Sequence, residues 1–321
     1  MSGIQGGAVQ PVAQVGLASR ATVRRRPGSL LRDSRTAYLM IAPMAILLSI
    51  FVIYPLAYAL YLSMFEISFY RDPVFVGPQF YGYVLDSPRF WNAISIGLRL
   101  AVMVVPVMLV IAFLIASLIR TLGRRLAGFL KTTIYLPTVV SGVVASVVFT
   151  LMYRLDGGLV NGALGVVGIG PFAYLSSPDL ALPAIAVPAI WLGIGVSSLI
   201  MLAGMLDIPE SYFEAAELEG AGFLAQTRYV TIPLLRNILL FLFVTGFILA
   251  MQQVDLPLVM TGGGPVDSTM TPNLFIFTQF KDPTPYATSF SLTAALILFF
   301  VLGSVSALIF RLVRSEKAVD A

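Results

Sequence analysis

Six long stretches of this chain carry no charged side chain, and they constrain its fold more than any other feature. They are residues 36–65, 100–119, 132–153, 180–206, 237–254 and 283–310. Crossing the hydrocarbon core of a bilayer takes roughly 20 apolar residues, and a helix satisfies its own backbone hydrogen bonds there. Only 11% of the 321 residues are charged, against about a quarter in soluble domains. We therefore predict an all-α integral membrane protein with six transmembrane helices.

The charge-free stretches also give the domain organisation. The expected helices are at about 37–65, 91–119, 132–153, 180–206, 236–258 and 288–311. They form one transmembrane domain, 37–311, which contains a polar loop at 207–235. A basic tail at 1–36, predicted to be disordered, precedes this domain, and a short tail at 312–321 follows it. The fifth helix reaches span length only by running past Asp255.

The distribution of Lys and Arg predicts the orientation, because cytoplasmic loops are enriched in both residues. One side would hold Arg20, Arg24, Arg25, Arg26, Arg32, Arg35, Arg120, Arg124, Arg125, Lys131, Arg228, Arg236, Arg311, Arg314 and Lys317. The other side would hold only Arg71, Arg89, Arg154 and Lys281, while Arg99 lies within or at the rim of the second helix. Both termini and the 207–235 loop are therefore expected in the cytoplasm.

Missing residue types exclude several function classes. The sequence has no cysteine and no histidine, so it has no disulfide, no thiolate metal site and no histidine acid–base group or metal ligand. It also has no G-x-x-x-x-G-K-[ST] phosphate-binding loop. We expect that this chain is not an enzyme, binds no metal and does not itself hydrolyse ATP.

The polar loop between the fourth and fifth helices is the most informative segment. It reads Glu214-Ala215-Ala216, then Glu219-Gly220-Ala221, then Pro233. The first residues favour a helix, the glycine permits a sharp reversal, and the proline limits the next helix. A solvated connection is the simpler interpretation. Small residues beside a glutamate, however, let a partner backbone approach and offer a carboxylate to an arginine.

This pattern resembles the coupling loop of the permease subunits of ABC importers. Glu219 replaces the usual aspartate, and Thr227-Arg228 replaces a usual pair of aromatic residues. The resemblance implies the type I ABC importer permease fold, with a separate ATPase docked on Glu214, Ala215, Ala216, Glu219, Gly220, Ala221 and Pro233. ATP and Mg²⁺ would then be bound by that ATPase, with no cofactor on this chain.

Further motifs resemble the carbohydrate-uptake branch of that family, the maltose and glycerol-3-phosphate type. They are FVGPQFY at 75–81, Asn161 in DGGLVNGAL, LAGML at 202–206, and Thr261 followed by Gly262, Gly263, Gly264 and Pro265. The resemblance implies a bacterial or archaeal cytoplasmic membrane, two ATPase subunits, a second permease chain (giving a heterodimer), and an extracytoplasmic solute-binding protein facing Asn161, Gly263, Gly264 and Pro265.

Polar groups within apolar spans predict the substrate pathway, because such groups are costly in a membrane unless they function. By the resemblance, Thr138, Ser141, Trp191, Gly193, Gln252 and Gln253 would line it, with Asp255 nearby. Two other interpretations stay open. The hydroxyl and amide groups could instead hydrogen-bond between helices, and Asp255 could form an ion pair with Arg99 or Arg154.

Two other function classes compete with this interpretation. An ion-coupled secondary transporter would need an intramembrane acid or a histidine relay, and Asp255 is the acid that the sequence offers. A membrane anchor would leave the Gln pair and the polar outer loops without a use. Within the importer interpretation, the solute could be a sugar, a glycerol phosphodiester or another compound, and the partner permease could make most of the contacts.

Overall fold

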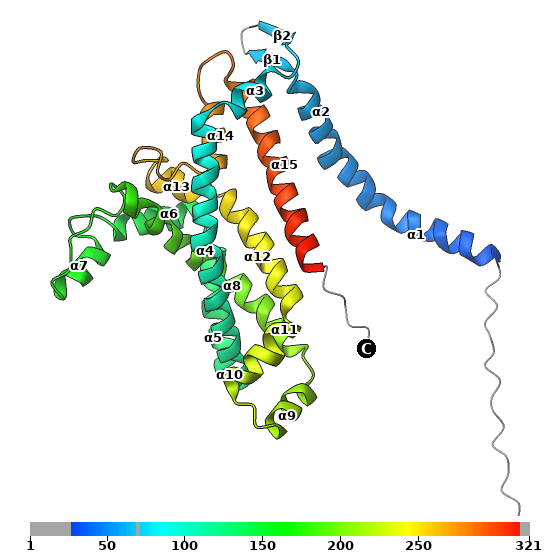
Figure 1. Ribbon diagram of the computed structural model, residues 1–321, viewed down its shortest axis with the longest axis vertical. Helices are drawn as coiled ribbons and strands as arrows, with labels where there is room; N and C mark the ends of the chain where they lie inside the picture. Colours follow the sequence, from blue (N-terminus) through cyan, green and yellow to red (C-terminus); the bar gives the residue numbers. More distant parts are fainter. Residues whose placement is uncertain (1–26, 69–70, 315–321) are drawn as a thin grey trace, which may run out of the picture. The chain divides into compact units, whose positions relative to one another are not determined.

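The computed structural model describes residues 27–68 and 71–314, which are helical almost throughout (Figure 1). They divide into two compact units after Ala57, and each unit is described by itself. The elements are α1 (Pro27–Leu48), η1 (Ser49–Ile53), α2 (Tyr54–Leu62), β1 (Phe65–Ser68), β2 (Arg71–Phe75), α3 (Gln79–Leu85), α4 (Pro88–Thr121), α5 (Arg124–Val139), α6 (Gly142–Met152), α7 (Leu159–Val166), α8 (Pro178–Leu206), α9 (Glu210–Leu218), α10 (Phe223–Gln226), η2 (Thr227–Thr231), α11 (Ile232–Leu234), α12 (Arg236–Met251), α13 (Asp255–Met260), α14 (Pro272–Phe280) and α15 (Ala287–Arg314).

The first unit is an apolar helix that continues through a π-helical turn, η1, into α2. The expected disordered tail at 1–36 is wrong from Pro27 onward, because helix α1 begins at that residue. Proline suits the first position of a helix because its missing N–H would have no partner there anyway. Residues 1–26 of the expected tail lie outside the described residues.

The second unit is organised around α4, which packs along α8 and α12. Its buried face carries Ala93, Gly97, Ala101, Ala112 and Ala116, and small residues of this kind let helices approach closely in a membrane. Gly97 shows how close the approach is: a Cβ there would lie 2.7 Å from the Cδ of Pro272, which begins α14. The helix thereby forms the centre of the second unit.

The third expected span, 132–153, is not one straight helix. Helix α5 ends at Val139, α6 begins at Gly142, and the two axes differ by 94°. Pro137 lies in the last turn of α5, where it cannot donate to the helix ladder, and Val140 and Ser141 are extended. The Ser141 side chain then caps α6 by accepting a hydrogen bond from the Val143 backbone (3.3 Å).

Other elements differ from their expected bounds at the ends. A gap at 252–254 separates α12 from α13, the fourth span begins at Pro178, and α15 continues to Arg314, into the expected tail at 312–321. Residues 315–321 lie outside the described residues. The segments expected to be outer loops contain the β1–β2 hairpin, α3, α7 and α14, which their short apolar runs did not reveal.

Within the described residues, five helices are long and apolar enough to cross a membrane, and six if the bent pair α5 and α6 counts as one span. Buried apolar residues of α4, α8, α9 and α12 form one core cluster beside the polar 207–235 segment. A second cluster joins α4, α8 and α13. The polar segment is thus attached directly to the packed core.

Candidate functional site

Helix α9 presents the Glu-Ala-Ala motif and ends in a Schellman arrangement. The Gly220 N–H donates to the Glu217 carbonyl and the Ala221 N–H to the Ala216 carbonyl, both at 2.9 Å. This pattern requires a left-handed residue at its turn, and Gly220 has φ +81°. The Gly-Ala pair of the motif is therefore what stops α9 and reverses the chain.

The motif residues differ in exposure. Glu214, Ala215, Glu219 and Gly220 are exposed, Ala216 and Ala221 are half-buried, and Phe213 is buried. Within the described part of the chain, the Glu214 carboxylate forms no hydrogen bond or ion pair. Pro233 lies apart from the others in α11, after the π-helical turn η2, and is also exposed. An exposed carboxylate next to small residues is a surface that another protein can bind.

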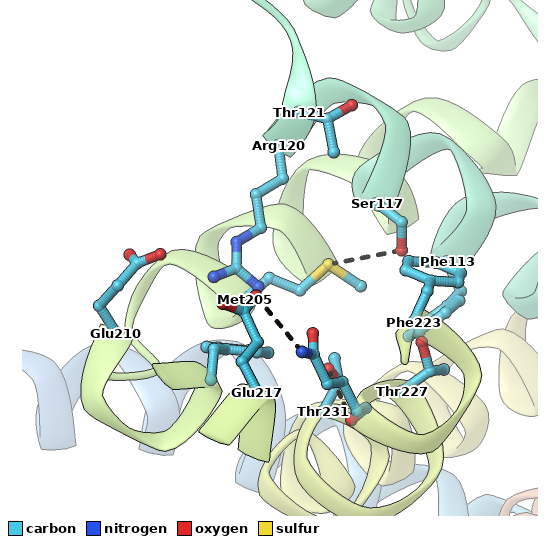
Figure 2. Close-up of a pocket in the computed structure, with 12 residues that line it drawn as sticks. Phe113, Ser117, Arg120, Thr121, Met205, Glu210, Glu217, Phe223, Thr227 and Thr231 are labelled. Carbon is cyan, nitrogen blue, oxygen red and sulfur yellow. Dashed lines mark hydrogen bonds between the residues drawn. The ribbon is translucent and has the colours of Figure 1, made fainter. Parts of the chain in front are cut away.

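A cavity of about 300 Å³ lies behind α9, between this helix, the end of α4 and the α10–η2 segment (Figure 2). The Arg120 guanidinium lies 4.1 Å from the centre of the Phe213 ring. Across the cavity, the Gln226 side chain donates to the Ala221 carbonyl (3.1 Å) and to the Glu217 carboxylate (3.5 Å). These contacts attach α9 to α4 on one side and to α10 on the other.

Thr227 and Arg228, which replace the aromatic pair usual in the resembled family, begin the π-helical turn η2. Thr227 lines the cavity, where an aromatic side chain would occupy part of the volume. Arg228 is exposed, with its guanidinium 5.8 Å from the centre of the neighbouring Tyr229 ring. The threonine therefore leaves the space behind α9 open.

A second cavity, of about 520 Å³, lies between α4, α5, α8 and α12. Three residues predicted for the pathway, Thr138, Gly193 and Gln253, line it together with Ser197 and Thr245. Three hydroxyl groups in its wall are already engaged: Thr138 donates to the Leu192 carbonyl, Thr245 to the Phe241 carbonyl, and Ser197 to the Met108 sulfur. Gln253 also lies in this wall, and its side-chain amide has no hydrogen-bond partner among the described residues.

Four other predicted pathway residues do not line this cavity. Ser141 caps α6, and the ring of Trp191 lies 5.8 Å from the ring of Phe149. Gln252 is exposed, and its carbonyl accepts from Asn273. The carboxylate of Asp255 lies against Gly142, where a Cβ would approach it to 2.8 Å.

The alternative ion pair of Asp255 with Arg99 or Arg154 is wrong. In the part of the chain that the structure describes, the salt bridge is Arg89 with Asp267. Neither the sequence position of Arg89 nor that of Asp267 signalled this pair, because 178 residues separate them. Thr245 and Met108 were also missed as cavity residues, since a lone threonine in an apolar helix gives no pattern to recognise.

Asn161 is buried and holds together the segment that contains α7. Its side-chain amide donates to the carbonyls of Arg154 (3.2 Å) and Phe172 (3.0 Å), and its oxygen accepts from the Phe172 N–H (2.9 Å). All three partners are backbone groups, so the side chain itself is not presented to a partner protein. Asn161 instead fixes the shape of the surrounding loop.

We expect Asn161→Ala to loosen this loop, because it leaves buried backbone groups without partners at a cost of about 1–3 kcal/mol. The measurement is the rate of limited proteolysis between residues 155 and 177 in detergent-solubilised protein. Asn237→Ala, at the exposed start of α12, is the control. Equal cleavage rates in the two variants would contradict this role.

The Thr261–Thr271 loop is also closed by its own bonds. The Thr269 hydroxyl donates to the Gly264 carbonyl (2.8 Å) and lies 2.7 Å from the Thr261 hydroxyl. Gly263 is buried at φ +90°, and a Cβ there would lie 2.5 Å from the Met270 methyl carbon. Gly264 and Pro265 are partly exposed beside it. The loop is thus a turn closed by its own hydrogen bonds, with Gly264 and Pro265 at its surface.

Comparison with solved structures shows the class of the fold. The chain is similar to that of a bacterial ABC transporter involved in the import of the acidic polysaccharide alginate, with a TM-score of 0.72, 18% identity and coverage of 90% of this chain and 99% of that one. A bacterial alginate ABC transporter in complex with an alginate pentasaccharide-bound periplasmic protein gives a TM-score of 0.73, at 18% identity and coverage of 90% and 98%. The protein is a multi-pass membrane protein with the fold of an ABC importer permease.

The family follows from the sequence comparisons. Residues 80–316 match the model of binding-protein-dependent transport system inner membrane components, and the chain belongs to this family. It is 30% identical to the sulfoquinovosyl glycerol transport system permease protein SmoG of Agrobacterium fabrum, over 89% of this chain and 92% of that protein. It is 28% identical to the trehalose/maltose permease MalF of Thermococcus litoralis (78% and 85% covered) and 30% identical to the lactose permease LacF of Rhizobium radiobacter (87% and 94% covered). Permeases of this family are transport subunits and not enzymes.

Proposed function

We propose that this chain is a permease subunit of an ATP-driven, binding-protein-dependent sugar importer and forms half of its translocation pathway. The observation that carries the proposal is helix α9. It exposes Glu214, which has no partner among the described residues, and it ends in the Gly220-Ala221 turn. The permeases SmoG, MalF and LacF, named for sulfoquinovosyl glycerol, trehalose/maltose and lactose, support a carbohydrate as the solute.

The proposed assembly contains a second permease chain, two ATPase subunits and an extracytoplasmic solute-binding protein. The ATPase would bind ATP and Mg²⁺ and dock on α9, and the binding protein would face the α7 segment and the Thr261–Thr271 loop. Both termini and α9 would then lie in the cytoplasm, as the Lys and Arg distribution predicts. Closing of the ATPase would move α9 and open the pathway to the outside.

The 520 Å³ cavity supports the proposal that this subunit contacts an uncharged part of a sugar. No charged residue is among those that line it, and its wall is mostly apolar. Sugars offer apolar C–H patches and hydroxyl groups, which match an apolar wall with one free amide. If the solute were an anion, the positively charged side chain that pairs with it would have to come from the partner permease. An ion-coupled mechanism finds no support in this wall, since Asp255 lies outside it.

Uptake by reconstituted vesicles tests the proposal. The binding protein is first screened by thermal shift against lactose, maltose, trehalose, sulfoquinovosyl glycerol and glycerol phosphodiesters. The stabilising solute is then offered to vesicles that hold the complete complex, with and without internal ATP. We expect uptake only with ATP and binding protein. Uptake driven by an ion gradient alone would overturn the proposal.

Gln253 offers a test of the cavity. We expect Gln253→Ala to lower sugar import about 3- to 10-fold, which corresponds to the loss of one hydrogen bond to the solute, with little change in basal ATPase activity. Gln252→Ala is the matched control, because that neighbouring side chain is exposed and outside the cavity wall. An unchanged import rate in Gln253→Ala would remove this residue from the pathway.

A further inference from the structure

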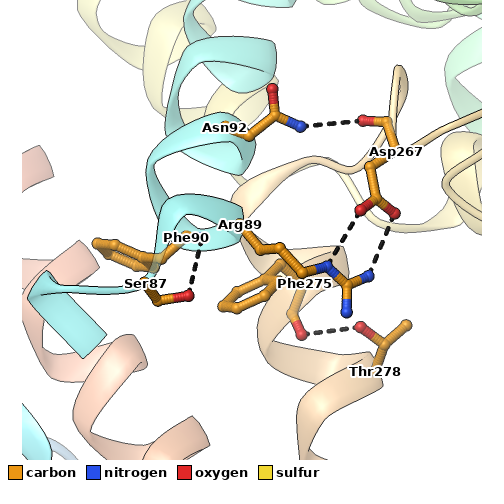
Figure 3. A network of polar contacts seen from close by, with 7 residues as sticks. All are labelled: Ser87, Arg89, Phe90, Asn92, Asp267, Phe275 and Thr278. Atoms are coloured by element: carbon orange, nitrogen blue, oxygen red, sulfur yellow. Dashed lines mark hydrogen bonds and ion pairs between the residues drawn. The ribbon is translucent and has the colours of Figure 1, made fainter. Parts of the chain in front are cut away.

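The end of α4 that begins at Pro88 is bound to the Thr261–Thr271 loop (Figure 3). The Arg89 guanidinium contacts both carboxylate oxygens of Asp267, at 3.1 and 3.2 Å. One turn further along, the Asn92 side-chain amide donates to the Asp267 carbonyl at 3.4 Å. Side chain and backbone of one loop residue are thus both held by the same helix.

Helix stability does not explain Arg89. It is the second residue of α4, where the positive end of the helix dipole disfavours a cation. The Asp267 carboxylate offsets that unfavourable position. The Arg89 side chain is 58% exposed and that of Asp267 is 35% exposed, and ion pairs that water can reach contribute little to folding. Its position therefore indicates a role other than stability.

The loop residues held in this way are strained. Val266 and Asp267 have φ values of 51° and 55°, a region that β-branched residues such as valine rarely adopt. Backbone strain of this kind persists only where the surroundings impose it, and it is common at functional sites. Val266, 91% exposed, forms the tip of the loop. The contacts from α4 hold this tip in place.

The other end of α4 is bound to the Glu-Ala-Ala helix. Arg120, in the last turn of α4, lies over the Phe213 ring of α9, with its guanidinium 4.1 Å from the ring centre. Phe213 directly precedes Glu214 and belongs to the same buried cluster as Met201, Met205 and Leu235. A cation over a ring is a directional contact. This contact connects α9 directly to the end of α4.

The helix between these two contacts is continuous. It has 34 residues, which makes it about 50 Å long, enough to cross the bilayer with its headgroup regions. Pro106 interrupts one backbone bond, but the neighbours α8 and α12 pack along the helix. Figure 1 shows one end of α4 near α3 and α14 and the other end near α10.

We propose that α4 is the element that transmits binding-protein occupancy to the coupling helix, with Arg89 and Arg120 as the positioning residues at its two ends. The inference rests on the proposed function, because it assigns a binding protein to the Val266 loop and an ATPase to α9. A loaded binding protein that displaces the loop moves Asp267, and with it the Pro88 end of α4. Arg120 passes the displacement to Phe213 and so to Glu214.

The test compares how strongly the loaded binding protein stimulates the ATPase activity of the reconstituted complex. The sugar used is the one that stabilises the binding protein in the thermal-shift screen. We expect Arg89→Ala and Arg120→Ala each to lower the stimulation factor roughly fivefold. Basal ATPase activity should stay unchanged in Arg89→Ala, which lies at the end of α4 away from α9. Arg99→Ala is the matched control, since Arg99 is an exposed cation of the same helix that has no hydrogen-bond or ion-pair partner among the described residues.

Exchanging the charges of Arg89 and Asp267 distinguishes loss of transmission through this ion pair from local structural damage. Arg89→Asp combined with Asp267→Arg is expected to recover at least half of the stimulation that either single change removes. Stimulation that stays at the wild-type level in both alanine variants overturns the proposal, as does a loss that the exchange leaves uncorrected. These results are distinct from failure of the proposed function, in which the unaltered complex itself shows no ATP-driven import.

Discussion

Glu214→Lys is expected to abolish ATP-driven import while the protein still inserts and folds. Glu214 is exposed on α9 and carries no partner within the described residues, so the substitution disturbs no internal contact. A docking arginine or lysine on the ATPase would meet a like charge. Breaking a charge-assisted contact at an interface costs about 2–5 kcal/mol or more, so we expect import to fall at least ~30-fold.

The measurement combines import with co-purification of the ATPase. Asp207→Lys is the control, because it reverses a charge at an exposed position at the end of α8, outside the Glu-Ala-Ala motif. Glu214→Gln keeps the size of the side chain and removes its charge, and we expect it to fall between the two. Normal import by Glu214→Lys, with the ATPase still bound, would refute the docking role of α9.

Local features were predictable from the sequence. Charge-free stretches indicate membrane spans because an unpaired charge in hydrocarbon is costly. The Gly220-Ala221 turn was predictable as well, since only glycine adopts its φ without strain. These predictions depend on residues that are close in the chain.

Features that depend on distant residues were not predictable. The break between α5 and α6 follows a proline, but the sequence also has prolines inside α4 and α8, which continue as single helices. Neighbouring helices decide which proline ends a helix. The contacts of Arg89 with Asp267 and of Arg120 with Phe213 likewise join segments that only the tertiary fold brings together.

The candidate pathway shows the same limit. Gln252 and Gln253 are adjacent and chemically identical, and the sequence assigned both to the pathway. The structure places only Gln253 in the cavity wall, because α12 ends at Met251 and the following residues turn. The pattern of polar residues alone therefore does not resolve which of the two amides faces the cavity.

Gly195→Leu is expected to destabilise the protein strongly. A Cβ at Gly195 would lie 2.5 Å from the Ile134 carbonyl oxygen and 2.8 Å from the Thr138 hydroxyl. The first of these is backbone and cannot rotate away, so α8 and α5 would have to separate. Overpacking of this kind costs about 1–3 kcal/mol or more, which lowers the melting temperature by about 2–5 °C or more in a protein of this size.

Thermal unfolding in detergent measures this effect. Gly303→Leu is the matched control: it places the same side chain on another apolar helix, α15, where nothing lies within 4 Å of the new Cβ. Since Thr138 contacts Gly195 and also lines the 520 Å³ cavity, the Gly195 variant should lose import together with stability. Equal melting temperatures for the two variants would show that α5 and α8 are not packed as closely as their backbones indicate.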